Sequence, residues 1–284
     1  MPVTSGLLPE TPPTPLVPVE DERLGGVRLL VKRDDLIDPD IPGNKWRKLK
    51  YNLAEAAAQG HDTLLTFGGA YSNHIRATAA AGRRYGFRTV GIIRGEEHSP
   101  LNPVLEYATA QGMELRYVSR TAYRDKPVPP GRFYVLPEGG SNALAVRGCA
   151  EAAAEITEPY DYLCCPVGTG GTLAGLAFGL RPGAHALGFA VLKGAAFLAD
   201  EVRRLQREHG EAAEEWSLEF GFHHGGYARR TPALDAFVAD FTARHGIPLD
   251  PVYTGKMLYG VYALAAAGRF PPGATVVAVL TGQG

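Results

Sequence analysis

The chain has 284 residues, of which 45% are hydrophobic and 21% are charged, and its formal net charge is -1. The length suffices for two α/β domains, and the composition is that of a soluble globular protein. The balanced charge gives no electrostatic reason to expect nucleic acid or an anionic membrane as a partner. No apolar run reaches membrane-spanning length, so we expect no membrane segment.

Residues 1–19 are rich in proline and have neither the basic start nor the long apolar run of a secretory signal. We expect this segment to lie extended on the surface. The three cysteines, Cys149, Cys164 and Cys165, fit the spacing of neither a disulfide framework nor a zinc site. They predict reduced thiols packed as small apolar side chains, and therefore a cytoplasmic location.

Short apolar runs alternate with alanine-rich runs along most of the chain. Strands are expected over residues 27–32, 63–67, 89–93, 114–118, 133–136, 160–167, 188–192 and 275–280. Helices are expected over residues 44–59, 73–85, about 102–111, 143–156, 172–179, 232–245 and 256–267. This alternation predicts an α/β fold in which helices cover both faces of parallel sheets.

Three glycine-rich turns, over residues 68–73, 139–142 and 168–172, stand at expected strand-to-helix junctions. In parallel sheets, ligands bind at the carboxyl ends of strands, where such turns gather. The third turn combines backbone N–H groups, threonine hydroxyls and a helix N-terminus, which together suit a phosphate. From the residues alone, a plain tight turn remains an alternative.

The third turn does not fit the two common nucleotide motifs. A dinucleotide site needs an acidic residue after the next strand, but Lys193 follows the strand at 188–192. A nucleoside-triphosphate loop needs a final Lys-Ser or Lys-Thr pair, which is absent here. A mononucleotide-like or cofactor phosphate remains as the expected ligand.

Lys45 stands at the start of an expected helix, beside the turn at Gly43. The helix dipole disfavours a cation at this end, which hints at a functional reason for the lysine. A desolvated lysine with a lowered pKa forms Schiff bases readily. The common alternative is an ordinary helix-surface lysine, and we expect Lys48 and Lys50 to lie on the solvated side.

Four segments, PGNKWRKLKY, TFGGAYSNHIRATAA, PVGTGGTLAG and DPVYTGK, occur in the order and spacing of one family. On these segments the chain, from about Thr14 to Thr281, resembles the pyridoxal-phosphate enzymes of the 1-aminocyclopropane-1-carboxylate deaminase and D-cysteine desulfhydrase group. The resemblance implies the two-domain fold of the tryptophan synthase β type and pyridoxal 5'-phosphate as cofactor. We expect a small domain at 48–141, inserted in a large cofactor-binding domain made of 1–47 and 142–284.

The resemblance also implies roles for single residues. Lys45 would hold the cofactor as a Schiff base, Asn73 would bond the phenolic oxygen of the cofactor, and Ser72 would contact the substrate carboxylate or assist proton transfer. Tyr227 and Tyr253 match the two active-site tyrosines of the family. The remaining cofactor contacts would come from the phosphate loop and from two threonines: Gly168, Thr169, Gly170, Gly171, Thr172, Thr254 and Thr281.

The two threonines bear on the reaction. The resembling deaminases carry Glu at the position of Thr254 and Leu at that of Thr281, whereas the resembling desulfhydrases carry Thr at both. A carboxylate keeps the pyridine nitrogen protonated and strengthens the electron sink that opening a cyclopropane needs. A hydroxyl suits β-elimination. We therefore predict a lyase that converts D-cysteine to pyruvate, hydrogen sulfide and ammonia.

Two alternatives remain. One is deamination of 1-aminocyclopropane-1-carboxylate to 2-oxobutanoate and ammonia. The other is a catalytically silent cofactor-binding protein, which the sequence Leu280-Thr281-Gly282-Gln283 keeps open, because the family usually has His-Thr-Gly-Gly here. The adjacent histidines, His223 and His224, do not predict a metal site. The expected partners are a small amino-acid substrate and a second copy of the chain, with no nucleic acid and no membrane.

Overall fold

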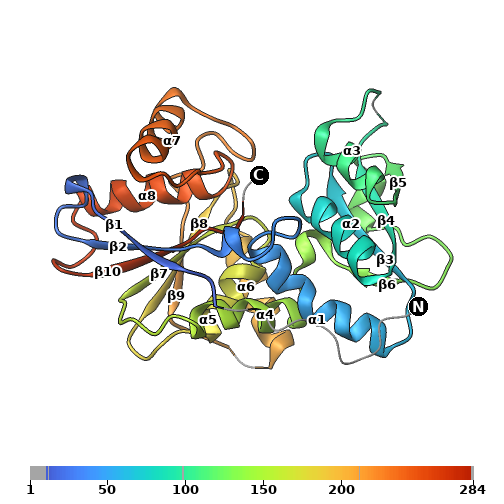
Figure 1. The fold of residues 1–284 in the computed structure, drawn as a ribbon, viewed down its shortest axis with the longest axis horizontal. Coiled ribbons are helices and arrows are strands. Elements are labelled where there is room, and N and C mark those ends of the chain that lie inside the picture. The colour runs from blue at the N-terminus through green and yellow to red at the C-terminus, as the bar shows by residue number, and fades with distance from the viewer. Residues whose placement is uncertain (1–10, 12, 98, 211, 283–284) are drawn as a thin grey trace.

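Two β-sheets form the two lobes of the molecule (Figure 1). The computed structural model describes residues 11, 13–97, 99–210 and 212–282. Its strands are β1 (Leu16–Val19), β2 (Arg28–Lys32), β3 (Thr63–Gly69), β4 (Arg88–Arg94), β5 (Met113–Val118), β6 (Tyr134–Leu136), β7 (Tyr162–Val167), β8 (His185–Ala190), β9 (Trp216–Glu219) and β10 (Thr275–Val279). Its α-helices are α1 (Asn44–Ala58), α2 (Asn73–Tyr85), α3 (Pro103–Ala110), α4 (Ala143–Ala154), α5 (Gly171–Phe178), α6 (Leu198–His209), α7 (Pro232–His245) and α8 (Thr254–Ala266).

The larger sheet has the strand order β1-β2-β10-β7-β8-β9. Its strands pair in parallel, except that β1 runs antiparallel to β2 at the edge. The late strand β10 lies between β2 and β7, so Val276 is opposite both Leu29 and Tyr162. The central position of β10 therefore joins the beginning of the chain to its second half.

Both faces of the larger sheet are covered by helices, as its apolar strands require. Successive side chains of a strand point to opposite faces. Cys164 accordingly packs in the core beneath α7 and α8, whereas Cys165 packs in the core beneath α4, α5 and α6. The adjacent cysteines are thus separated by the sheet, and both are free and buried, as predicted.

The smaller sheet is made by the chain between β2 and β7, with the order β5-β4-β3-β6 and parallel pairing throughout. Helices α1 and α2 pack on one face, where Trp46 and Leu49 of α1 meet Leu64 of β3. On the other face, Tyr123 from the short 3-10 helix at 122–125 packs against Phe67 of β3. Helix α1 runs from one lobe toward the other (Figure 1).

The predicted α/β fold with helix-covered parallel sheets is confirmed. The predicted boundaries of the small domain remain a prediction; α1 crosses the one at 47/48. Residues 1–10 and 12 of the proline-rich segment lie outside the described residues, and Leu16–Val19 forms the edge strand β1. Proline has no backbone N–H to donate, so it is tolerated in an edge strand, which has a neighbouring strand on one side only. The sequence predicted neither β1, α6 nor β9 as a regular element.

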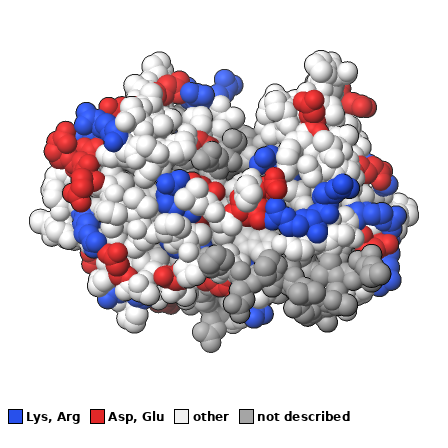
Figure 2. All heavy atoms as spheres, viewed as in Figure 1, with Lys and Arg blue, Asp and Glu red and all other residues white. Residues whose placement is uncertain are grey.

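A hollow separates the two lobes on the face shown in Figure 2, and acidic and basic side chains are interspersed over that face. This distribution agrees with the balanced net charge of the sequence. None of the helices in the described ranges has the length and apolarity needed to cross a bilayer.

Candidate active site

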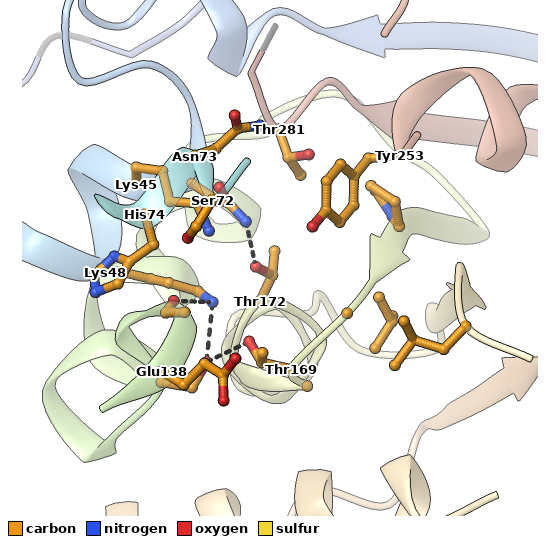
Figure 3. A pocket seen from close by; sticks show the side chains of 18 of the residues that line it. Lys45, Lys48, Ser72, Asn73, His74, Glu138, Thr169, Thr172, Tyr253 and Thr281 are labelled. Carbon is orange, nitrogen blue, oxygen red and sulfur yellow. Dashed lines mark hydrogen bonds between the residues drawn. The ribbon is translucent and has the colours of Figure 1, made fainter. Parts of the chain in front are cut away.

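A cavity of about 810 Å³ lies between the lobes, at the carboxyl ends of strands from both sheets. Its walls come from the start of α1, the turns after β3 and β7, the end of β10 and the turn that begins α8 (Figure 3). Of the predicted site residues, ten line this one cavity: Lys45, Ser72, Asn73, Gly168, Thr169, Gly170, Thr172, Tyr227, Tyr253 and Thr281. The other two, Gly171 and Thr254, do not line it.

Lys45 is the second residue of α1, and its half-buried side chain lines the cavity. Burial, with the positive charge of Lys48 as a smaller cause, lowers the pKa of the Lys45 amine to about 7. A substantial fraction of this amine is therefore neutral at physiological pH. A neutral amine is the form that attacks a carbonyl carbon.

The backbone around Gly43 fixes where Lys45 begins its helix. Gly43 has φ +60°, and a Cβ atom there would lie 2.0 Å from the carbonyl oxygen of Thr281. The same oxygen accepts a hydrogen bond from the backbone N–H of Asn44, at 3.1 Å. Only glycine allows this close approach, so the segment after β10 abuts the start of α1.

The prediction for Lys48 is wrong. Its side chain is 2% exposed and lines the cavity, because it lies three residues after Lys45 and so on the same helix face. The ammonium donates to the carbonyl of Gly139 at 3.1 Å and to the hydroxyl of Ser141 at 3.0 Å. Burial lowers its pKa. Lys50 pairs instead with Glu151, outside the cavity.

The turn between β7 and α5 forms a cradle of small residues. Gly170 adopts φ +79° and immediately precedes α5. No side chain caps the backbone N–H groups at the start of this helix. Thr169 exchanges a hydrogen bond with Ser141 at 2.8 Å, and Thr172 accepts one from Asn44 at 2.8 Å. Gly171 is the first residue of α5, where a Cβ would lie 2.6 Å from the Ser141 hydroxyl.

Ser72 and Asn73 begin α2 at the opposite wall. The hydroxyl of Ser72 caps the helix by accepting the backbone N–H of Ile75 at 3.3 Å. His74 follows and is buried, with its Nε2 atom 2.9 Å from the Thr66 hydroxyl. Burial and the nearby lysines hold its pKa well below the usual value. His74 is thus a neutral ring that supports the wall.

Two tyrosines face each other on the remaining side of the cavity. The rings of Tyr227 and Tyr253 are 6.0 Å apart and inclined by 70°. Tyr253 precedes α8, and burial raises the pKa of its phenol well above the usual value. It stays protonated and can act as a hydrogen-bond donor. Tyr227 comes from the loop between β9 and α7 and is 42% exposed.

The sequence did not single out Asp250, although it lines the cavity. Its carboxylate accepts the backbone N–H groups of Val252, Tyr253 and Thr254 at 2.8 to 2.9 Å. The hydroxyl of Thr254 also donates to it, at 3.1 Å. An acidic residue a few positions before a helix is a usual capping signal, which the segment DPVYT displays.

Five further charged residues line the cavity and were not predicted: Arg94, Lys126, Glu138, Glu201 and Arg204. Glu138 pairs with Lys126 at 2.8 Å, and Glu201 pairs with Arg204 at 2.6 Å. No local sequence motif predicts that these residues line the cavity, because their position there depends on how the two lobes meet. Among the described residues, no group of three or more His, Cys, Asp or Glu side chains is arranged to hold a metal ion.

The geometry combines a nucleophilic amine with an anion cradle, and comparison with known proteins names the matching cofactor. A sequence profile of the family described as "Pyridoxal-phosphate dependent enzyme" matches residues 7–282. The chain belongs to this family. The predicted cofactor and enzyme class are therefore confirmed: the protein is a pyridoxal-phosphate-dependent lyase or deaminase.

Relatives within the family support this assignment. A Pyrococcus furiosus protein provisionally described as a 1-aminocyclopropane-1-carboxylate deaminase is 31% identical over 300 residues, covering 94% of this chain and 91% of its own. The D-cysteine desulfhydrase of Klebsiella pneumoniae is 32% identical over 306 residues, covering 95% and 91%. The crystal structure of an ACC deaminase homologue, 28% identical, superposes with a TM-score of 0.80 over 95% of this chain and 89% of that one.

The residues of this cavity fit pyridoxal phosphate. An aldehyde needs a neutral amine, which the lowered pKa of Lys45 provides. A phosphate needs N–H donors and positive charge, which the uncapped start of α5 and the ammonium of Lys48 provide. Among the described residues, Lys48 has no carboxylate within ion-pair distance, so its charge is available to an anion.

Proposed function

We propose that the protein eliminates the β-substituent of a small D-amino acid, with D-cysteine as the substrate that gives pyruvate, hydrogen sulfide and ammonia. The observation that carries this proposal is the state of the acids around the cavity. Each lining carboxylate already has partners: Glu138 has Lys126, Glu201 has Arg204, and Asp250 has three backbone N–H groups. Within the described lining, none is free to pair with a pyridinium nitrogen.

This absence distinguishes between two reactions. When bound, the cofactor supplies an electron sink for the pair released at the substrate's α-carbon. A carboxylate beside the ring nitrogen would strengthen that sink, and opening a cyclopropane without an α-hydrogen depends on it. The hydroxyl of Thr281, which lines the cavity, cannot enforce protonation, and neither can that of Thr254, which does not line the cavity and donates to Asp250. These hydroxyls favour elimination, in which a good leaving group departs soon after the α-proton is removed.

The residues divide the work between binding and proton transfer. Lys48 and the turn from Gly168 to Thr172 would hold the phosphate, and Asn73 would contact the phenolic oxygen. The substrate carboxylate lies at the start of α2, where Ser72 and the helix N-terminus favour an anion. Thr281 also lines the cavity, above Thr172 in the view of Figure 3.

Lys45 would hold the cofactor, and its amine would accept the α-proton of the substrate. A pKa of about 7 suits this task, because a base works best when its pKa is near the working pH. Tyr253 and Tyr227 face the leaving group, and the protonated phenol of Tyr253 donates a hydrogen bond to the departing sulfur. The pair also shields that side of the cavity from water.

A direct assay tests the proposal. Purified protein with added pyridoxal phosphate is incubated separately with D-cysteine, L-cysteine and 1-aminocyclopropane-1-carboxylate. We expect sulfide, pyruvate and ammonia from D-cysteine, with turnover at least about tenfold above that of the other two compounds, which corresponds to about 1.4 kcal/mol of transition-state discrimination. Lys45→Ala serves as the inactive control.

Other product patterns would replace the proposal. Formation of 2-oxobutanoate from 1-aminocyclopropane-1-carboxylate, without sulfide from D-cysteine, would assign the deaminase reaction instead. Cofactor binding without any product would leave a silent binding protein.

We also propose that the enzyme acts in the cytoplasm as a homodimer. The three buried, free thiols support a reducing compartment, and the dimer rests on the family resemblance. Light scattering of the purified holoenzyme tests the dimer: a mass near 30.4 kDa, that of one chain, would contradict it.

A further inference from the structure

Lys256 is a buried lysine that the proposed mechanism does not use. It is the third residue of α8 and is 1% exposed. Burying an ammonium costs free energy, and a helix N-terminus disfavours a positive charge still more. The position of Lys256 is therefore unfavourable for the stability of α8, and a contact outside the helix has to account for it.

The contact that Lys256 makes points to that explanation. Its ammonium donates a hydrogen bond to the backbone carbonyl of Gly226 at 2.8 Å. Among the described residues, this is the one hydrogen bond that the ammonium makes. No carboxylate of the described residues lies within ion-pair distance of Lys256. The carboxylate of Asp250 instead accepts three backbone N–H groups. The charge of Lys256 is thus directed at one carbonyl, and Gly226 immediately precedes Tyr227.

The loop that carries Tyr227 touches the rest of the fold through rings, since Phe222 packs near Phe189 and His224 packs edge-on against Tyr259 of α8. Among the described residues, the bond from Lys256 is the one hydrogen bond that joins the loop to α8. The loop joins β9 to α7 through residues 220–231 without pairing to a strand, and its backbone turns sharply at Gly226 (φ +121°) and Ala228 (φ +54°). Within the loop, short-range bonds link His223 to Gly226 and Gly226 to Arg229. Segments of this kind open readily unless they are tied to a rigid element.

Helix α8 supplies that rigid element and also positions the partner ring. Tyr253 precedes the first turn of α8, and Lys256 follows three residues later in the same turn. One turn of helix therefore places the Tyr253 ring in the cavity and anchors the loop whose Tyr227 ring lies 6.0 Å away.

We propose that Lys256 is a positioning residue that ties the Gly226 carbonyl to α8 and so holds Tyr227 against Tyr253 at the active site. The role of the two tyrosines rests on the proposed function. The tether itself is a property of the loop and can be measured without turnover.

The first test measures the loop directly in the holoenzyme. In Lys256→Met, hydrogen–deuterium exchange of the peptide covering residues 221–231 should accelerate by about ten- to a hundredfold, because a hydrogen bond from a charged donor is lost. Leu258→Ala is the matched control: this buried α8 side chain packs in the core and, being apolar, donates no hydrogen bond to the loop. It should lower the melting temperature without accelerating exchange selectively in that peptide.

The second test measures coupling to Tyr227. Lys256→Met alone should lower kcat/KM by roughly tenfold, whereas in a Tyr227→Ala background it should add less than about twofold. Lys256→Arg, which retains a charged donor, should recover most of the loss. If Lys256→Met does not fold, Lys256→Gln is measured against the same criteria.

Two results would overturn the proposal: unchanged exchange over residues 221–231, or the full loss of activity repeated in the Tyr227→Ala background. If no amino acid is turned over, the proposed function fails, but the exchange measurement still decides whether Lys256 holds the loop.

Discussion

The chemistry of the site begins with one amine whose surroundings change its proton affinity. The pKa of Lys45 is lowered to about 7, so the neutral amine dominates above that pH and the ammonium below it. We expect the rate at which cofactor-free protein attaches pyridoxal phosphate to rise about tenfold per pH unit below pH 7 and to level off above it.

Stopped-flow absorbance of cofactor-free protein across pH 5.5 to 9, as an approximate range around the lysine pKa, would measure this profile. Lys45→Ala should show no covalent attachment at any pH, while Lys50→Ala should follow the parent protein, since Lys50 lies outside the cavity. A rate that is still rising steeply at the upper end of this range would show that burial does not tune the amine.

Lys48 is a second lysine of the cavity, and among the described residues no carboxylate lies within ion-pair distance of its ammonium. Lys48→Met should weaken the affinity for pyridoxal phosphate by about ten- to a hundredfold, since a charged hydrogen bond to the phosphate is lost. Fluorescence titration would measure the dissociation constant. The same substitution should leave the affinity for pyridoxal, which has no phosphate, nearly unchanged; equal weakening of both would refute a phosphate contact.

The comparison of these two lysines shows how far local sequence patterns reach. Once Lys45 faces the cavity, helical periodicity places Lys48 on the same side, so its burial was predictable from spacing. Asp250 carried a capping signal that could also have been recognised. The contact between Lys256 and Gly226 could not have been recognised. It joins residues 30 apart in the chain, and Gly226 lies in a loop without a regular sequence pattern.

At the scale of elements, the junction between α1 and the segment after β10 depends on a glycine. Gly43→Ala should destabilise the fold by about 2 to 4 kcal/mol, because the added methyl group is both strained at positive φ and blocked by the Thr281 carbonyl. Denaturant unfolding would measure the change.

Gly268→Ala controls for positive φ alone, because Gly43 also has a ψ of -135°, which residues with a side chain rarely combine with positive φ. Gly268 has φ +65°, close to that of Gly43, but a Cβ there meets no atom within 4 Å. It should cost only about 1 to 2 kcal/mol, the conformational part alone. Equal losses in the two variants would mean that the close approach to Thr281 contributes nothing.

The elements themselves were predictable where periodicity or apolar runs were strong. Helix α7 was predicted with its observed bounds, 232–245, because Pro232 and Gly246 mark its ends. Helix α6 was missed although its apolar residues recur at helical spacing among many charges. Strand β9 has only four residues and is paired on one side only, so its existence depends on β8 more than on its own sequence.

At the scale of the whole molecule, the cofactor should act as a stabilising ligand. A ligand that binds the folded state alone adds about 2.7 kcal/mol at about 100 times its Kd. We expect the free energy of unfolding to rise with pyridoxal phosphate concentration, and to rise less in Lys48→Met. Calorimetry or denaturant titration would measure this change. An unchanged unfolding midpoint at saturating cofactor would contradict selective binding to the folded state.

The central place of β10 in the larger sheet sets an order of events during synthesis. While a ribosome is still making the chain, β2 and β7 can each find early neighbours, but the space between them stays empty until residues 275–279 emerge. The segment that follows β10 brings Thr281 to the start of α1. The nascent protein therefore cannot complete its reactive centre before residues 275–281 have been made, so a shorter chain does not trap a reactive aldehyde cofactor at a properly formed site.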